Sequence, residues 1–155
     1  MKWKGAWLLC LLLAGCDKPN DTQLITETGR ELQRTIDTSS ARLRCEEIAK
    51  GRERLSRDVR QKLEAQHCQN VLRSATETNF TDTTIYRHNT TMICGGILGK
   101  SFTGSMIYRR FIYSPDEKAL VIEPVSEADK TRFEGQKTVQ QLQDDFNRQH
   151  QQYCQ

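Results

Sequence analysis

Residues 106–123 read MIYRRFIYSPDEKALVIE and contain two strand-like runs on either side of a turn. Met106–Tyr113 and Ala119–Glu123 are rich in the aromatic and β-branched residues that strands favour. Between them, Ser114-Pro115-Asp116-Glu117 combines proline with acidic residues, which is typical of a tight turn. The sequence therefore predicts a β-hairpin at this point.

Residues 76–123 are predicted to form a small antiparallel sheet, because two more strand-like runs, Thr83–Tyr86 and Thr90–Cys94, precede the hairpin. The glycines that follow, in Cys94-Gly-Gly-Ile-Leu-Gly-Lys-Ser101, predict a turn between two strands. This octapeptide nearly matches a phosphate-binding P-loop, but that loop needs glycine in its first position and a helix after its last. Here the first position is cysteine and a strand follows, so we expect no nucleotide site.

Helical patterns flank the expected sheet on both sides. Residues 23–74 are predicted to be helical, and the first helix, from Gln23, has so thin an apolar stripe that it would pack loosely or continue the tether. Residues 127–152 are predicted to form a C-terminal helix packed on the sheet. Helices and strands that are separated along the chain in this way indicate an α+β fold. The last helix is expected to bury Phe133, Val139, Leu142, Phe146 and Tyr153.

Residues 1–17 read MKWKGAWLLCLLLAGCD and have the order of a targeting signal. Lys2 and Lys4 would hold the amino end at the cytoplasmic face, and the apolar run that follows is far shorter than the ~20 residues of a spanning helix. Leu13-Ala14-Gly15-Cys16 resembles the processing site of a bacterial lipoprotein. The resemblance implies cleavage before Cys16 and acylation of Cys16. An ordinary secretory signal and a buried apolar strand are the alternatives.

The lipoprotein resemblance also divides the chain and implies a location. Residues 1–15 would be the signal peptide, 16–22 a tether and 23–155 a single periplasmic domain. The membrane would be a partner through the acyl chains on Cys16, since each buried methylene contributes about 0.8 kcal/mol. Asp17 resembles the residue that retains enterobacterial lipoproteins at the inner membrane, which implies a periplasm-facing inner-membrane protein. The alternative location is the outer membrane.

The remaining cysteines predict a covalent framework. Aromatic residues make up only 7% of the chain, so the core is small and favours covalent staples. Cys45, Cys68, Cys94 and Cys154 are even in number, which in an oxidising compartment indicates two disulfides with three possible pairings. We favour Cys45–Cys68, between helical segments, and Cys94–Cys154, between the sheet and the last helix. A zinc site of Cys45, His67, Cys68 and Cys94 is the alternative, but no CxxC pair supports it, so we expect no metal or other cofactor.

Charge and motif content favour a binding protein over an enzyme. The formal net charge of +3 falls to about +1 without Lys2 and Lys4, which gives no argument for nucleic acid. A basic helical face that includes Arg57, Arg60 and Lys62 is interspersed with acidic residues, so we interpret it as a solvated face rather than a lipid-binding surface. The sequence presents no recognisable catalytic pattern. The alternative is a periplasmic hydrolase with a site assembled from Arg109, Arg110, Glu123 and His88.

A characteristic order of motifs joins the sheet to the last helix. A strand ends in Cys94-Gly95, a loop contains Gly99-Lys100, an aromatic strand follows at Arg110–Tyr113, and a helix ends in Cys154. In this order residues 56–154 resemble a small domain of proteobacterial periplasmic proteins and lipoproteins, which brings no known activity. Through Cys16-Asp17 and its size, the whole chain is similar to inner-membrane lipoproteins of enterobacterial prophages. The lipid anchor, the disulfides and the missing catalytic pattern predict a non-catalytic envelope protein that binds an envelope protein partner or acts in exclusion or envelope stress.

Two substitutions separate anchoring from sorting. Cys16→Ser should abolish palmitate labelling and leave an unprocessed or soluble protein, because the acylated thiol is removed. Asp17→Ser should keep the label but move the protein to the outer membrane, because only the sorting residue has changed. Density-gradient fractionation of labelled membranes measures both effects. Labelling of Cys16→Ser would contradict lipidation, and wild-type protein in the outer-membrane fraction of a Gram-negative host would contradict the role of Asp17.

Overall fold

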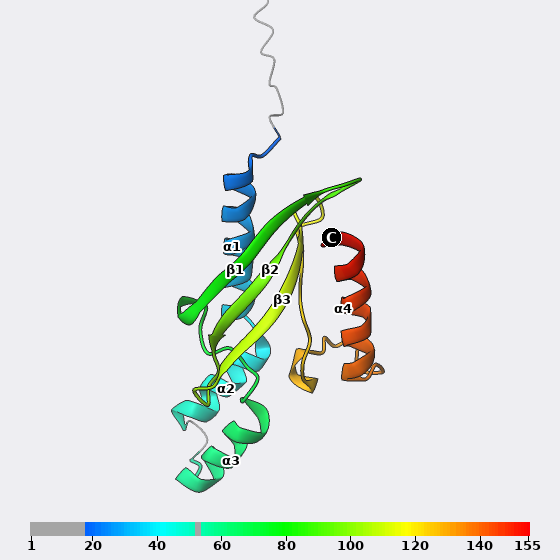
Figure 1. The fold of residues 1–155 in the computed structure, drawn as a ribbon. Coiled ribbons are helices and arrows are strands. Elements are labelled where there is room, and N and C mark those ends of the chain that lie inside the picture. Colours follow the sequence, from blue (N-terminus) through cyan, green and yellow to red (C-terminus); the bar gives the residue numbers. More distant parts are fainter. Residues whose placement is uncertain (1–17, 52–53) are drawn as a thin grey trace, which may run out of the picture.

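The computed structural model describes residues 18–51 and 54–155 and has the expected α+β fold. Cys16, Asp17 and the cleavage site before them lie outside the described residues. Helices stand before and after a four-stranded antiparallel sheet (Figure 1). The elements are α1 (Asp21–Asp37), α2 (Ser40–Lys50), α3 (Arg57–His67), the short 3-10 helix η1 (Ala75–Glu77), β1 (Thr78–Arg87), β2 (Thr91–Lys100), β3 (Met106–Ser114), β4 (Ala119–Ile122), a second 3-10 helix η2 (Glu127–Asp129) and α4 (Val139–Tyr153).

Each strand of the sheet pairs with the next one along the chain, in the order β1-β2-β3-β4. β3 and β4 form the hairpin predicted from the sequence, with Phe111 opposite Ile122 and Ser114 opposite Ala119. α1 lies against one face of the sheet and α4 against the other, while α2 and α3 lie beyond one end (Figure 1). Because both faces are covered, the central strand β2 is buried along most of its length.

The main core lies between α1 and the sheet. Apolar residues of α1 pack against alternate residues of β2 and β3, which point to the same face. A polar contact supports this packing, because the hydroxyl of Tyr113 donates a hydrogen bond to Glu27 of α1 at 2.7 Å. Burial, together with this bond, raises the pKa of the Tyr113 phenol. The buried members of the core are Leu24, Leu32, Ile36, Leu72, Ala75, Ile93, Ile97, Phe111 and Tyr113.

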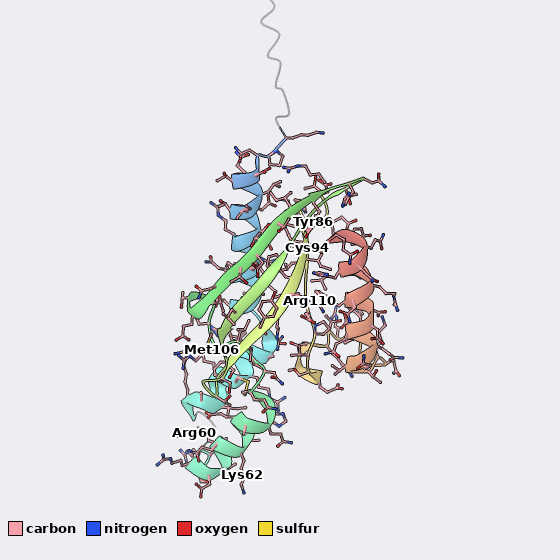
Figure 2. All side chains as sticks on the ribbon, viewed as in Figure 1. Arg60, Lys62, Tyr86, Cys94, Met106 and Arg110 are labelled. Atoms are coloured by element: carbon pink, nitrogen blue, oxygen red, sulfur yellow. A yellow bond between two sulfur atoms is a disulfide. The ribbon has the colours of Figure 1, made fainter. Side chains whose placement is uncertain are left out.

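A second cluster lies between α4 and the opposite face of the sheet. It contains Cys94, Ile112, Phe146 and Cys154, all of them buried. The guanidinium carbon of Arg110 lies 5.1 Å from the centre of the Phe146 ring, in a cation–π contact between β3 and α4. Cys94 of β2 and Arg110 of β3 both lie on the part of the sheet that is beside α4 (Figure 2).

The glycines Gly95, Gly96 and Gly99 lie inside β2, so the turn expected there is wrong. They provide space rather than a turn. A Cβ atom on Gly95 would lie 2.9 Å from the ring of Phe111, and one on Gly96 would lie 2.3 Å from the ring of Tyr108. The two rings therefore cover β2 where its own side chains would otherwise stand, one on each face.

The C-terminal helix begins at Val139, so the expected start at residue 127 is wrong. Thr138 and Gln141 form a capping box, in which each side chain accepts a hydrogen bond from the backbone N–H of the other. The chain between η2 and Thr138 is irregular, and Phe133, expected in the buried stripe, is 83% exposed. Within that stripe Leu142 and Phe146 are buried as expected.

The N-terminal helices also differ from the expected boundaries. α1 begins at Asp21 behind a capping box of Asn20 and Gln23, so the end of the expected tether is helical. Its packing is not loose, because Leu24, Leu32 and Ile36 are buried, although Ile25 is exposed. The buried hydroxyl of Thr28 donates a hydrogen bond to the carbonyl of Leu24. The helical region ends with α3 at His67 rather than at residue 74.

Both disulfides favoured from the sequence are present, and they leave no thiolate for the zinc alternative. Cys45–Cys68 joins α2 to the end of α3 within a small cluster that also contains Ile48 and Val71. Cys94–Cys154 joins β2 to the end of α4. Each bond therefore fixes a helix that otherwise makes limited apolar contact with the rest of the domain.

Removing the two disulfides should cost different amounts of stability. The pair Cys94→Ala and Cys154→Ala should lower the free energy of unfolding by about 4 kcal/mol, and Cys45→Ala with Cys68→Ala by about 3 kcal/mol. The reason is the loop that each bond closes, since the sequence separations are 60 and 23. Urea denaturation of the oxidised proteins measures both values. A larger loss from the Cys45–Cys68 pair would contradict this account.

Candidate binding cleft

A cleft of about 640 Å³ opens at the free edge of the sheet, beside β4. The corner between α1 and α2 lines one side of it, and α4 lines the other. Residues of the segment 124–137, which contains η2, complete the lining. The apolar part of the lining includes Ile36, Leu72, Leu120, Ile122, Leu142 and Phe146.

The cleft exists because β4 is short. β4 has 4 residues, whereas α1 has 17 and α4 has 15. The two helices cover opposite faces of the sheet and are each roughly 23–26 Å long, about twice the length of β4. Both therefore extend past the edge strand, and Ile36 of α1 and Phe146 of α4 line the same space.

The N-terminus of α2 contributes polar groups to the cleft. Thr38, Ser39 and Ser40 line it at the turn between α1 and α2. The hydroxyl of Ser39 accepts a hydrogen bond from the backbone N–H of Arg42 and caps the helix. Because the first turn of α2 contains no acidic side chain, the helix itself supplies no negative charge to balance the positive end of its dipole.

Arg109 lines the cleft and binds the chain segment that follows β4. Its side chain is only 8% exposed and forms an ion pair with Asp129 at 2.7 Å. It also donates to the main-chain carbonyl of Asn70. The second carboxylate oxygen of Asp129 accepts the backbone N–H groups of Val125 and Ser126, each at 2.9 Å. Arg109 therefore holds the chain after β4 in place at the cleft.

Arg42 is the second arginine of the cleft, and its side chain is 17% exposed. Its guanidinium forms an ion pair with Glu46 at 2.8 Å, and its Nε lies 3.7 Å from Asp37. Over residues 18–51 and 54–155, the buried side-chain polar atoms without a hydrogen-bond partner are the Nε atoms of Arg42 and Arg109. Both therefore belong to arginines of the same cleft.

A polar cluster at Arg110 holds α4 against the sheet. Arg110 donates to Glu123 through Nε and Nη2, at 3.1 and 2.6 Å, and Nη2 also donates to Asn147 of α4 at 2.6 Å. Burial acts to raise the pKa of Glu123, but the hydrogen bonds from Arg110 outweigh it and hold that pKa below its ordinary value. Burial, followed by the charge of Arg110, lowers the pKa of His150.

The residues named for a hydrolase are not gathered into one site. Arg109 and Arg110 are consecutive in β3 and point to opposite faces of the sheet, so Arg109 contacts Asp129 while Arg110 contacts Glu123. His88 lies between β1 and β2, where its Nε2 is 2.8 Å from the carbonyl oxygen of Gln155.

Arg42 and Asp129 were not singled out from the sequence. Asp129 pairs with Arg109, which lies 20 residues away in another element. Arg42 pairs with Glu46 one helical turn along α2, a spacing that is also usual for exposed ion pairs.

The described residues, 18–51 and 54–155, present neither a candidate metal site nor a candidate membrane-spanning helix. In this part of the chain no cluster of histidine, cysteine, aspartate and glutamate has the arrangement of a metal site. None of the helices in these ranges is both long and apolar enough to cross a bilayer. Comparison of the sequence with protein-family models and with characterised proteins, and of the fold with solved structures, finds no match.

Neutralising Glu123 should flatten the dependence of stability on pH. A carboxylate whose pKa is lowered in the folded state adds stability above its unfolded pKa, and this is lost as the pH falls through the folded value. Glu123→Gln should therefore unfold about 1 kcal/mol more easily than wild type at pH 7, with the difference shrinking towards pH 3. Chemical denaturation across this range measures it, and the exposed Glu117→Gln serves as the control. An undiminished difference at pH 3 would contradict the assignment.

Proposed function

We propose that this chain is a lipid-anchored envelope protein that faces the periplasm and binds a protein partner in the cleft. The anchor and the location rest on the lipoprotein-like sequence around Cys16 and Asp17. The binding role is carried by one observation, which is the combination in one cleft of apolar walls, an open strand edge and buried arginines. Concave sites with apolar walls and a few convergent polar groups are the usual form of binding sites.

The titrating carboxyl groups Glu123 and Asp145 do not suit the role of general acid in the hydrolase alternative. A general acid needs a carboxyl group whose pKa is raised towards neutrality. Glu123, the acid of the hydrolase alternative, has its pKa lowered through its hydrogen bonds with Arg110, which outweigh the effect of burial. Asp145, which lines the cleft, also has a lowered pKa because Lys137 and Arg148 contact it. Both groups are therefore ionised at neutral pH and suited to holding structure or charge.

The position of α1 fits a domain held close to a membrane. The folded domain begins at the cap residue Asn20, four residues after Cys16, so a chain anchored at Cys16 would place the start of α1 within about 14 Å of the lipid. α2 and α3 lie at the opposite end of the domain, with Arg60 and Lys62 of α3 there (Figure 2). This arrangement favours a solvated role for the basic face of α3.

Site-specific crosslinking tests the proposed partner site. Gln149 lines the cleft, whereas Gln151 is another exposed residue, two positions along α4, that does not. The photoreactive residue p-benzoylphenylalanine at position 149 should capture one envelope protein in intact membranes, and the same residue at position 151 should not. Filling the cleft with Ala128→Trp should abolish capture, while Ala65→Trp on α3 should leave it unchanged.

Two results would contradict the proposal. Equal capture from positions 149 and 151 would show that contacts are not confined to the cleft. Capture that persists in Ala128→Trp, with the fold intact by circular dichroism, would place the partner elsewhere. Turnover of a peptide, glycan or ester substrate that is lost in Glu123→Gln would favour the hydrolase instead.

A further inference from the structure

We propose that one end of the domain rests on the lipid bilayer. This end face is defined by the start of α1, the β1–β2 turn and the end of α4, which are residues 18–21, 87–90 and 153–155. The inference rests on the proposed function, because it takes Cys16 as the acylated residue. Two independent features carry it, the short tether after Cys16 and a pair of contacts that join the three segments into one surface.

The tether from Cys16 keeps the start of α1 at the membrane. Asn20, the cap residue of α1, is four residues after Cys16, so a fully extended chain places it within about 14 Å of the lipid. The acyl chains on Cys16 would hold that end of the tether in the bilayer. Residues that are fixed to the start of α1 are therefore held beside the membrane as well.

Two contacts fix distant segments of the chain to the start of α1. Arg87, the last residue of β1, forms an ion pair with Asp21, the first residue of α1. The Nε2 of His88, in the turn that follows, lies 2.8 Å from the carbonyl oxygen of Gln155, which comes after α4. The three segments therefore form one continuous surface, and Figure 1 shows them towards the same end of the domain, opposite α3.

The charges of the end face suit a surface of lipid headgroups. Every residue of its first two segments is exposed. Asp21 is the only carboxylate side chain in the three segments, and its partner Arg87 balances it, while Lys18 adds a positive charge. No unpaired carboxylate side chain therefore repels anionic headgroups from this surface. α4, in contrast, presents along its length the exposed carboxylate of Asp144, which pairs with no cation among the described residues.

Aromatic side chains border the end face. Tyr86 and Tyr153 are half-buried and pack on the cluster around Cys94–Cys154. The ring of Tyr86 is also stacked on the ring of His88, with 6.5 Å between their centroids. Tyrosine has an apolar ring and a polar hydroxyl, and it is enriched where proteins meet the membrane–water interface. The two tyrosines therefore place amphipathic rings beside the headgroup layer.

The contact with the bilayer would also set the height of the cleft. α1 runs away from the end face, and Ile36 in the cleft lies 15 residues after Asp21. A helix rises about 1.5 Å per residue, which gives roughly 22 Å between the two positions. The corner of the cleft between α1 and α2 is therefore held in the aqueous layer. The partner that fits it is a water-exposed part of an envelope protein rather than a membrane-spanning segment.

Tryptophan emission from the full chain, processed and reconstituted in vesicles, tests this inference. Trp3 and Trp7 are the only tryptophans of the sequence, and both lie in the proposed signal peptide, so the processed protein contains none. A single tryptophan introduced by substitution then reports on one position. The vesicles contain phosphatidylethanolamine and phosphatidylglycerol, and the quencher is phosphatidylcholine that carries a nitroxide on its headgroup.

Asn89→Trp, in the end face, should lose most of its emission when the quencher is added, because the β1–β2 turn lies among the headgroups. Thr90→Trp is a second probe of the same turn and should be quenched as well. Three control positions should keep their emission, because they lie on the sides or at the far end of the domain. These are exposed residues of α1, α4 and α3, changed in Arg34→Trp, Gln140→Trp and Lys62→Trp.

The outcomes separate this inference from the proposed function. Wild-type protein that floats with the vesicles without tryptophan emission is processed and anchored. If Asn89→Trp and Thr90→Trp, folded by circular dichroism, then keep their emission, the end face is wrong while the anchor stands. Equal quenching of Arg34→Trp or Gln140→Trp would overturn the inference in the same way. Wild-type protein that retains its emission and stays in solution would overturn the anchor, and this inference with it.

Discussion

The close packing of two aromatic rings on two glycines of β2 is the constraint on which the structure depends. Phe111 covers Gly95 on one face of the sheet and Tyr108 covers Gly96 on the other. Both rings lie so close that a side chain at either glycine position would clash with them. A central strand that is flat at this point can be buried on both sides without crowding. On one face Phe111 joins the core beneath α1, and on the other Tyr108, which is 51% exposed, covers the strand itself, in a chain with only 7% aromatic residues.

The cleft follows from how the two helices are fixed. Tyr113 donates to Glu27 and so ties α1 to β3, while Cys94–Cys154 and the contacts of Arg110 tie α4 to the opposite face. Neither helix can shift to close over the short edge strand without breaking one of these contacts. The open edge of β4 is therefore maintained by interactions made elsewhere in the sheet, and it stays accessible because the helices that flank it are held in place.

Much of the fold was predictable because it depends on local chemistry. The turn at Ser114–Glu117 and the even number of cysteines indicated the hairpin and the disulfides. Gly95 and Gly96 were misinterpreted because a turn and a strand packed against aromatic rings have the same glycine content, and only tertiary contact distinguishes them. The pairing of Arg109 with Asp129 was not predictable, since it joins β3 to the short helix η2, 20 residues further along the chain. The site was therefore less predictable than the fold.

Stability and binding are connected through the same few residues. Two buried donors without partners, on Arg42 and Arg109, cost about 1–3 kcal/mol each, a sizeable part of the roughly 5–15 kcal/mol that separates a typical domain from its unfolded chain. The disulfides stabilise the fold by a comparable amount, about 3–4 kcal/mol each, and lie outside the cleft. A small domain that is stabilised by two disulfides can tolerate a cleft in which two buried arginine donors lack hydrogen-bond partners. The two arginines that carry these donors shape the wall of the cleft through their ion pairs with Glu46 and Asp129, so the cost falls where the cleft is built.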